Sequence, residues 1–502
     1  MSAPCHPAPN PPAPPLHSTL AAASHNAASN HTSGKINASS SHSAPSNAPH
    51  IVIVGAGWAG CAAAVRAVQN GAKVTLLEAS RTLGGRARSM DLATAPAGAL
   101  DNGQHIMLAA YTDTLALMRT LGACPETLLQ RLPLDLRTPD GHGLQLRPAR
   151  SAQLAALSAI MRAQGWNWRE KWRLLRAAAQ WRLQGFSCPE HSSVADLCQG
   201  LGPVVFQSMI ESLCVAAFNS APHETSGAVF LRVLQDALFS AAGASDALIA
   251  RTPFGQLLPE PALAWLQAHG ARIALGQRVQ ALRPTADGWQ LTCSPISTHD
   301  AAEAPFDHVI LACPAWEASR LVQGLAQDGL QGNPQGIQHL QQWVQQANAL
   351  QHVPIATLYA WCPSSACSRL PPMQALACTS KDEAQFVFHH AHRQPMASST
   401  GAVETLLAFV ASHCTDDRQA LETAIATQAR EQLGLPTLHI IRTTIEKRAT
   451  FICRPALQRP AMRISTGLWA CGDYVHGPYP ATLEGAVRSG LQAADACCAA
   501  LS

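Results

Sequence analysis

The chain has 502 residues, of which 47% are hydrophobic and 13% charged, and its formal net charge at pH 7 is +3. A chain of this length can form two or more domains, and its nearly balanced charge gives no reason to expect nucleic acid as a partner. No run of about 18 uncharged apolar residues is present, which excludes a membrane-spanning helix of ordinary length.

Residues 1–48 are rich in Ala, Ser, Pro, His and Asn, and Lys35 is their only strongly charged residue. Such a segment buries too little apolar surface to offset the entropy lost on ordering, so we predict a disordered tail. It lacks the basic start and the continuous apolar core of a signal peptide.

The chain contains 16 cysteines, and none of them is spaced C-x-x-C. Most stand alone in apolar segments, which indicates reduced thiols in the core rather than a disulfide framework. We therefore expect a cytoplasmic protein without a metal site.

The first strong motif begins with residues 51–54, a continuous β-branched run typical of a buried parallel strand. Gly55, Gly57 and Gly60 follow in G-x-G-x-x-G spacing and open an Ala-rich helix predicted over 61–70. The three glycines permit a tight turn, a close approach of backbone to a pyrophosphate, and close packing of helix on strand. The free N–H groups of the helix would face the phosphates, so the motif predicts dinucleotide binding.

A second predicted strand, 73–77, ends at Glu78, whose carboxylate can accept hydrogen bonds from a ribose. Six residues past this acid, Gly84 and Gly85 are followed by Arg86. This Gly-Gly-Arg turn resembles the extended fingerprint of flavoproteins of the amine oxidase and phytoene desaturase superfamily. Domains that bind nicotinamide cofactors usually lack the turn, so the resemblance favours FAD over NAD.

The second strong motif lies near the C-terminus, where a strand predicted over 467–471 ends in Gly472 and Asp473. A helix then begins near Thr482 and continues past Gly490. An acid at a strand end can hold a ribityl hydroxyl, and the N-terminus of the helix can stabilise negative charge at flavin N1 and C2. Both motifs would serve one FAD, so the nucleotide-binding domain must be discontinuous in sequence.

The remaining patterns predict helices and strands in alternation. They favour helices at 115–121, 149–186, 204–214 and 229–238, and strands at 272–275, 279–282, 306–312, 354–361 and 404–412, with a hairpin turn at 287–288. We predict an α/β fold with a Rossmann-like FAD-binding domain from 49–100, 251–320 and 444–500. An interleaved α+β substrate-binding domain is predicted from 101–250 and 321–443.

One predicted helical stretch is unusual because tryptophans and cations alternate along it. It contains Trp166, Trp168, Trp172, Trp181, Arg162, Arg169, Lys171, Arg173, Arg176 and Arg182. Such a composition suits a membrane interface, where the rings lie at headgroup depth and the cations meet anionic lipid. The alternative is a solvated helix whose tryptophans pack in the core.

With both ends considered, residues 50–497 resemble the FAD-dependent amine oxidase and phytoene desaturase superfamily. Within it the chain most resembles the squalene-associated desaturase-like flavoproteins, the hydroxysqualene dehydroxylases of bacterial hopanoid biosynthesis. The segments that carry this closer resemblance are 100–105, 230–234, 243–246, 446–451, 472–473 and 480–486. The resemblance implies reductive dehydroxylation of the C30 isoprenoid hydroxysqualene to squalene, an oxidoreductase reaction of terpenoid metabolism.

The resemblance also implies which residues bind FAD. In this superfamily the residue at the place of Val279 contacts adenine through its backbone, and the segment with Gln104 and His105 passes the isoalloxazine. His105 could instead only cap the helix that follows. The expected cofactor-binding residues are Gly55, Gly57, Trp58, Ala59, Gly60, Glu78, Gly84, Gly85, Arg86, Arg88, Gln104, Val279, Gly472, Asp473, Thr482, Leu483, Glu484 and Ala486.

Departure of an allylic hydroxyl requires a proton donor, for which we consider His105 first and Tyr479 second. The long apolar isoprenoid substrate requires an apolar tunnel. We expect its mouth at the Trp- and Arg-rich stretch, on a protein bound peripherally to the inner membrane surface. A hydroxysqualene-forming synthase is a candidate partner.

Other activities remain open on the same scaffold. A carotenoid-type desaturase would oxidise a hydrocarbon, and an amine oxidase would need an active-site lysine and an aromatic cage, whereas the chain has only 4 tyrosines. A non-redox prenyl-binding carrier would bind no flavin, and a flavin-dependent isomerase would return its hydride. Retention of both FAD motifs disfavours the carrier.

Overall fold

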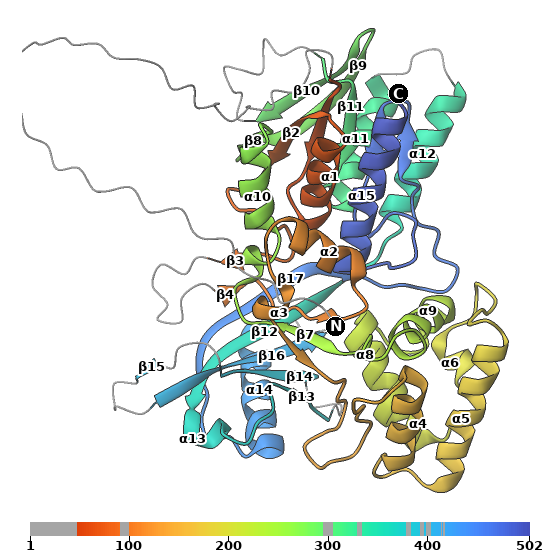
Figure 1. Cartoon of the computed structure of the whole chain (residues 1–502), viewed down its shortest axis with the longest axis vertical. Coiled ribbons are helices and arrows are strands. Elements are labelled where there is room, and N and C mark those ends of the chain that lie inside the picture. The colour runs from red at the N-terminus through yellow and green to blue at the C-terminus, as the bar shows by residue number, and fades with distance from the viewer. Residues whose placement is uncertain are drawn as a thin grey trace, which may run out of the picture. The chain divides into compact units, whose positions relative to one another are not determined.

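The computed structural model describes residues 48–90, 100–294, 305–328, 334–377, 383–391, 396–397, 403–412, 414 and 417–501 (Figure 1). The predicted disordered tail lies, apart from Ala48, outside the described residues.

A six-stranded sheet carries the nucleotide-binding motifs. In spatial order it contains β18 (Arg463–Ser465), β19 (Leu468–Ala470), β11 (His308–Leu311), β1 (His50–Val54), β2 (Lys73–Glu78) and β8 (Arg272–Leu275). All neighbours are parallel except β18, which pairs antiparallel with β19. The predicted α/β class is confirmed, and strands far apart in sequence meet in one sheet.

Alternate residues of β1 face two different helical layers. Ile51 and Ile53 pack with α1 (Trp58–Gln69), α10 (Pro259–Ala268) and α15 (Leu483–Ala499). On the other face, Val52 and Val54 pack with the helices α11 (Ala315–Asp328) and α12 (Pro334–Asn348) and with the hairpin of β9 (Arg278–Thr285) and β10 (Gly288–Ser294). The hairpin is present as predicted, and its turn is at 286–287, one residue earlier than predicted.

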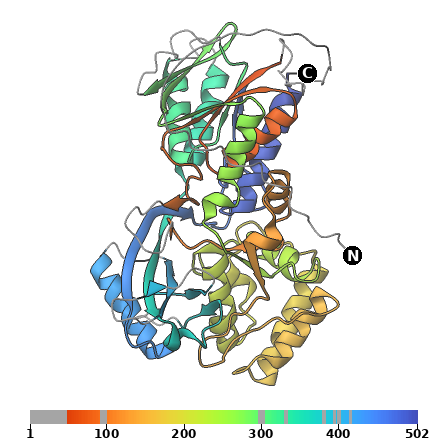
Figure 2. The same cartoon turned by 60° about the vertical axis from the view of Figure 1, so that its left-hand side comes forward.

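The second large sheet is antiparallel and has a helix on one face. Its strands, in spatial order, are β13 (Met373–Ala375), β14 (Phe386–His390), β16 (Val403–Ser412), β12 (His352–Pro363) and β17 (His439–Phe451), and β15 (Met396–Ala397) pairs with β16. All pairs are antiparallel. Even-numbered residues of β12 pack against α14 (Arg418–Leu433), which covers one face, as Figure 2 shows. α13 (Ser364–Cys367) follows β12.

These contacts differ from two of the predicted domain boundaries. The boundary at residue 320 is too early, because Leu340 and Trp343 of α12 pack in the same core cluster as β1. The boundary at 444 falls inside β17, which pairs with β12 as far as Phe451. In both places, the contacts that assign the segment to a domain join residues that are distant in sequence.

Helices from 152 to 238 pack around a core of their own. They are α4 (Ala152–Arg162), α5 (Trp168–Leu183), α6 (Val194–Leu197), α7 (Pro203–Val205), the π-helix η1 (Phe206–Glu211), α8 (Ser212–Phe218) and α9 (Gly227–Leu238). The predicted helical stretch 149–186 is interrupted at Gly165, whose φ is +80°. Asn167 then begins α5 with a capping box, in which its side chain and that of Glu170 bond each other's backbone N–H.

Short elements connect these layers. They are β3 (Ser89–Met90), β4 (Leu100–Asp101), β5 (Met107–Leu108), α2 (Thr112–Thr120), α3 (Pro125–Leu128), β6 (Leu129–Leu132), β7 (Ala247–Ala250) and the 3₁₀ turn η2 (Phe254–Gln256). In the ranges given above, no helix is both long and apolar enough to cross a membrane. All fourteen cysteines in those ranges are free thiols.

Candidate cofactor and substrate site

The glycine turn between β1 and α1 has the geometry that its spacing predicts. Gly55 has φ +110°, and a Cβ there would lie 2.8 Å from the Ala312 carbonyl oxygen. A Cβ on Gly60 would lie 1.8 Å from the Gly55 oxygen, so only glycine permits this packing. Above Gly57 the surface is open, because the nearest atom to a Cβ would be Gly85 Cα at 3.9 Å.

The N-terminus of α1 is suited to an anion. Its N-cap, Gly57, offers no side-chain cap, and its first turn contains no acidic residue. The unpaired N–H groups therefore face the cavity where Trp58 and Ala59 form the wall. This cradle fits a pyrophosphate.

Glu78 lines the same cavity and also fixes the turn. Its Oε2 accepts from Ala56 N at 2.7 Å, and its Oε1 accepts from Ser80 N at 2.8 Å. A carboxylate held in this way presents its remaining lone pairs in a defined direction. This arrangement fits the predicted contact with a ribose.

The Gly-Gly-Arg turn lies against the first glycine turn. Gly84 and Gly85 have φ of +97° and +59°, and Gly84 N donates to Ala56 O at 2.9 Å. Arg86 Nη2 forms an ion pair of 2.5 Å with Asp473 Oδ1, which joins the two predicted motifs across 387 residues. Nearby, Arg88 donates to the Gly85 carbonyl.

The C-terminal motif lines the same cavity. Thr482 caps α15 by accepting from Gly485 N at 2.9 Å. The predicted residues of this motif that line the cavity are Gly472, Asp473, Thr482, Leu483 and Ala486.

Glu484 also lines the cavity, but its carboxylate serves another element. Its side chain is only 1% exposed, and its two oxygens accept from Asp113 N, Thr114 N and Thr114 Oγ1 at 3.0, 3.0 and 2.7 Å. The carboxylate therefore caps the N-terminus of α2, and the predicted contact of Glu484 with the cofactor remains a prediction.

Val279 lies at the far end of the groove, in β9. Its carbonyl accepts from Arg320 Nη2 at 2.8 Å, so one of its two backbone groups is already bonded within the chain. It lines the cavity beside Gln277 and Arg278. The predicted adenine contact remains a prediction.

Gln104 is fixed against the second sheet, by residues of β12 and β14. Its N–H donates to Thr357 Oγ1 at 3.0 Å, and its Oε1 lies 2.8 Å from His390 Nε2. His105 follows it, and its ring lies against Phe254 with centroids 5.0 Å apart. Both predicted residues line the cavity, and neither caps α2, whose N-terminus is bonded by Glu484.

Burial, together with the nearby charges of Arg86 and Arg88, lowers the pKa of His105 to about 4. The imidazole is therefore neutral at pH 7 and holds no extra proton to donate. This finding weighs against His105 as the acid of the reaction.

The depressed pKa of His105 predicts a pH dependence of stability. Below the unfolded value of about 6.5 the unfolded chain binds a proton that the folded chain refuses until about pH 4, so stability falls across this window and not above it. In urea unfolding of the apoprotein, His105→Gln should reduce the loss of unfolding free energy between pH 7 and pH 5 by up to about 2 kcal/mol. The exposed His191 provides a matched His→Gln control, which should leave the loss unchanged. An equal loss in both variants would contradict the prediction.

Beyond the cofactor groove, the cavity of about 810 Å³ continues between the second sheet and the helices. Its walls there are apolar: Ile106, Leu108, Leu134, Leu136, Leu144, Met209, Leu213, Val215, Ala216, Ala217, Val233, Leu234, Ala237, Leu238, Ala247, Ile355, Met373, Phe386, Phe388 and Val410. This lining fits a long hydrocarbon chain.

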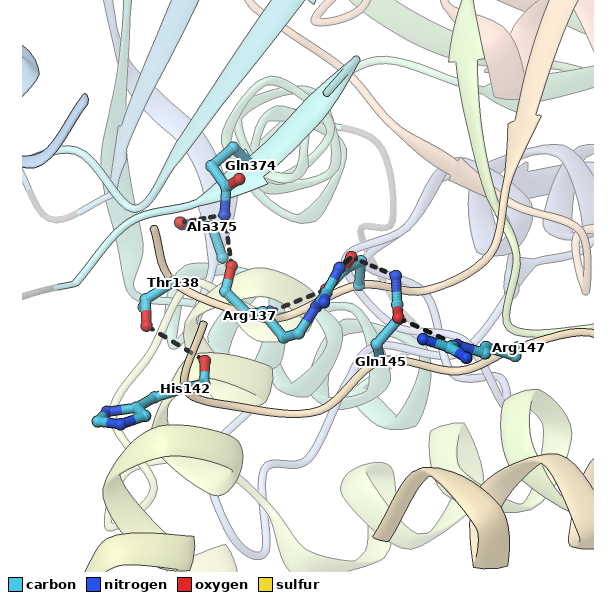
Figure 3. Close-up of polar contacts among 8 residues, drawn as sticks. Arg137, Thr138, His142, Gln145, Arg147, Gln374 and Ala375 are labelled. Carbon is cyan, nitrogen blue, oxygen red and sulfur yellow. Dashed lines mark hydrogen bonds and ion pairs between the residues drawn. The ribbon is translucent and has the colours of Figure 1, made fainter. Parts of the chain in front are cut away.

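Figure 3 shows how one part of this apolar wall is held. Leu134, Leu136 and Leu144 line the cavity from a two-stranded turn, while the alternate residues bond on the other side. Arg137 pairs with Asp135 at 2.6 Å, Gln145 donates to Asp135 at 2.9 Å, and Gln374 of β13 donates to the Arg137 carbonyl. The turn is thereby tied to the second sheet.

Tyr479 is clamped at the cavity wall by two arginines. Its hydroxyl oxygen accepts from Arg232 Nη2 at 3.1 Å, and the guanidinium carbons of Arg232 and Arg488 lie 5.2 and 5.0 Å from the ring centroid. Each arginine also pairs with its own carboxylate, Asp236 or Asp113. The arginines could not be found from the sequence, because they join the ring only through the fold.

The Trp- and Arg-rich stretch divides into two environments. Trp166 and Trp181 are buried, whereas Trp168 and Trp172 are 62% and 61% exposed. Within the described chain, no residue between 145 and 208 lines the cavity, so the predicted tunnel mouth is not formed by these side chains. Over the same described ranges, no group of three His, Cys, Asp or Glu side chains is placed to hold a metal ion.

The fold and the site together define a flavoprotein: the chain belongs to the flavin containing amine oxidoreductase family, whose model matches residues 58–498. It is an FAD-dependent oxidoreductase. Among curated proteins, the hydroxysqualene dehydroxylase of Rhodopseudomonas palustris is 27% identical over 471 residues, covering 88% of this chain and 97% of the relative. The hydroxysqualene dehydroxylase of Sinorhizobium fredii is 26% identical over 462 residues, covering 89% and 97%.

A solved structure shows the same fold. Cyclohexylamine oxidase from Brevibacterium oxydans IH-35A is 16% identical, and the match covers 90% of this chain and 99% of that chain with a TM-score of 0.61.

Proposed function

We propose that this chain catalyses the reductive dehydroxylation of hydroxysqualene to squalene. The observation that carries the proposal is the apolar cavity that continues from the FAD groove, combined with the relatives of this activity that match nearly the whole chain. When bound, reduced FAD supplies the hydride, and the balance is R–OH + FADH₂ → R–H + FAD + H₂O.

The residues of the chain support three parts of this reaction. The apolar walls bind the hydrocarbon and exclude water, which protects an allylic cation from hydration. Gln104 lines the cavity in a fixed position, because its backbone N–H donates to Thr357 and its side-chain oxygen bonds to His390. A proton donor for the leaving oxygen is the third part.

Tyr479 is the better placed of the two proposed donors. After its proton leaves, the N–H of Arg232 that already points at the phenol oxygen stabilises the negative charge there. His105 is neutral near pH 7, so it carries no imidazolium proton to give. We therefore assign the proton donor to Tyr479.

Tyr479→Phe should lower the single-turnover rate about 100-fold and leave the FAD content unchanged, because general acid catalysis is commonly worth this much. The measurement is squalene formation after mixing the reduced protein with hydroxysqualene. His105→Gln serves as the comparison and should lose much less rate. A Tyr479→Phe protein with full rate would assign the proton to another group.

The reaction itself is tested anaerobically on the purified FAD-bound protein. After reduction with dithionite, hydroxysqualene should reoxidise the flavin and yield one squalene per FAD. If the reduced protein ignores hydroxysqualene, while phytoene reduces the oxidised protein, the chain is a desaturase and the proposed direction of electron flow is wrong.

We also propose that the protein binds an anionic membrane surface through α4 and α5. The patch consists of the exposed side chains Leu154, Leu157, Met161, Trp168 and Trp172, which we call the α4–α5 patch. Lys171 of α5 donates to the Met161 carbonyl of α4 at 2.8 Å, which brings the two helices together.

Charge supports this assignment of the α4–α5 patch. Residues 147–182 contain eight arginines or lysines, and their single acid, Glu170, is buried in the capping box. Exposed tryptophan beside cations is the composition of proteins that bind at a lipid interface.

Replacing Trp168 and Trp172 together with alanine should weaken binding to phosphatidylglycerol vesicles by about tenfold or more, because both rings are lost from the interface. Co-sedimentation measures the binding. The control is the double alanine variant of Val403 and Ile440, two exposed apolar residues elsewhere. Equal binding by both double variants would remove the membrane assignment.

A further inference from the structure

Strand β17 places a carboxylate in the wall of the cavity. Thr443 Oγ1 donates to Glu422 of α14 at 2.6 Å, and Ile445 packs with the core cluster that contains residues of α14. Side chains alternate between the two faces of a strand, so Glu446 points away from α14. The cavity lies on that side of the strand, and Glu446 lines it.

Glu446 lies where the apolar part of the cavity meets the cofactor groove. Its register partner on β12 is Ile355, which belongs to the apolar wall. On the other side is Arg86 of the Gly-Gly-Arg turn. Burial alone would lower the pKa of Arg86, but the charge and hydrogen bond of Asp473, together with the charge of Glu446, raise it above its ordinary value. The Glu446 carboxylate is therefore close to both the hydrocarbon lining and the cofactor-binding residues.

The Glu446 carboxylate has no direct partner among the residues that the structure describes. The nearby guanidinium of Arg86 is already engaged, because Nη2 pairs with Asp473 at 2.5 Å and Nη1 donates to the Ala449 carbonyl at 3.2 Å. No described side chain donates a hydrogen bond to Glu446 or forms an ion pair with it. A partly buried carboxylate beside an apolar wall costs free energy unless it is paired or serves a ligand. The ligand that it favours is a cation.

We propose that Glu446 stabilises the positive charge that develops on the allylic carbon of the substrate as its hydroxyl departs. The inference rests on the proposed dehydroxylation. The C–O bond breaks with its electron pair on oxygen, which takes the proton of Tyr479 and leaves as water. The carbon then accepts a hydride from bound reduced FAD, whose remaining proton restores Tyr479. Glu446 forms no bond in this sequence and acts through its charge alone.

A carboxylate in this position lowers the reaction barrier without strengthening substrate binding. The alcohol is neutral and gains little from a negative charge beside it. The developing cation gains the full attraction, which apolar walls strengthen because they exclude water. An interaction that appears only as the charge develops accelerates the chemical step. Glu446 is therefore a catalytic residue that acts on the carbon, while Tyr479 acts on the oxygen.

A quaternary ammonium analogue tests this preference for positive charge without turnover. In this probe a dimethylammonium nitrogen replaces the carbinol carbon between the two isoprenoid arms, and the neutral probe has a dimethyl-substituted carbon there. Equilibrium dialysis in neutral detergent micelles gives the affinity of the oxidised, FAD-bound protein for each probe, referred to its concentration in the micelle. Glu446→Gln should lower the ratio of the two affinities about tenfold, because the charge is lost at equal size.

Two further variants control for size and for charge elsewhere. Glu446→Asp keeps the charge and should retain most of the preference for the ammonium probe. Glu431→Gln removes an exposed carboxylate of α14 and should leave the ratio unchanged. Should Glu446→Gln lose FAD or melt early, the unaltered protein decides, because equal affinity for the two probes would overturn the inference without any variant.

Single-turnover rates separate this inference from the proposed function. Glu446→Gln should lower squalene formation about 100-fold while the affinity for hydroxysqualene stays the same. If the unaltered protein forms squalene and Glu446→Gln keeps both the rate and the affinity ratio, Glu446 only lines the wall, and the dehydroxylase assignment stands. If the unaltered protein forms no squalene, the proposed function and this role of Glu446 fail together.

Discussion

Gly490→Ala should destabilise the protein by about 3 kcal/mol or more and lower its FAD content, as measured by urea unfolding and flavin absorbance. Gly490 lies where α15 crosses α1, and Figure 1 shows these two helices side by side. A Cβ on Gly490 would lie 2.2 Å from the Ala59 carbonyl oxygen and 3.1 Å from Ala62 Cβ. Backbone cannot yield as a flexible side chain does, so the two helix N-termini that flank the cofactor groove must separate.

A matched glycine-to-alanine substitution elsewhere should stabilise the protein instead. Gly324 lies inside α11, and no atom lies within 4 Å of a Cβ placed there. Gly324→Ala should therefore raise the unfolding free energy by about 0.5–1 kcal/mol, since alanine loses less backbone entropy in a helix. If Gly490→Ala were no worse than Gly324→Ala, the close crossing of α1 and α15 would not exist in solution.

Asp473→Ala should weaken FAD binding at least about 100-fold, measured by titrating the apoprotein with FAD. Two losses combine: the predicted acceptor of a ribityl hydroxyl disappears, and Arg86 keeps its charge in a partly buried place without its partner. Removing one partner of a buried ion pair costs about 3–5 kcal/mol at the upper limit. The side chain of Arg86 is partly exposed, which lowers this cost.

Glu126→Ala is the control for this variant. It also breaks an arginine–carboxylate pair, with Arg119 at 2.6 Å, but both side chains are at least half exposed. Exposed pairs contribute little, so FAD affinity and stability should hardly change. Full FAD affinity in Asp473→Ala would show that the acid at the end of β19 does not hold the cofactor.

The sequence predicted those parts of the molecule whose determinants are local. Strand β1, the three glycines and helix α1 form one continuous stretch, and each residue there has a reason that involves its near neighbours. The hairpin of β9 and β10 is local in the same sense. The C-terminal motif was also predictable, because a strand, an acid and a helix N-terminus follow one another directly.

The features that the sequence did not reveal depend on partners far away in sequence. Glu484 lies in the first turn of α15, where an acidic residue is common, but the groups that its carboxylate binds in α2 are about 370 residues away. Likewise, the assignment of α12 depends on packing against β1. The sequence could have shown which tryptophans are exposed. Trp168 and Trp172 are four residues apart and share a helical face, whereas Trp181 lies on the nearly opposite face.

The hydrogen bond between Ser412 and Asn219 at the cavity wall could not be predicted for a related reason. The two residues are 193 positions apart, and no pattern in either segment indicates the other. The resemblance to flavoproteins pointed to the cofactor groove and left the substrate side unspecified, because that part of the cavity is built from side chains that only the tertiary fold brings together.

The crossing of α1 and α15 also sets the order of events during synthesis. α1 ends at Gln69 and α15 begins at Leu483, so more than 400 residues must be translated before the second helix can cover the first. At about 5–20 residues per second this takes roughly 20–80 s. Throughout that interval the face of α1 that α15 covers has no native partner, so this core is completed only after the last helix has left the ribosome.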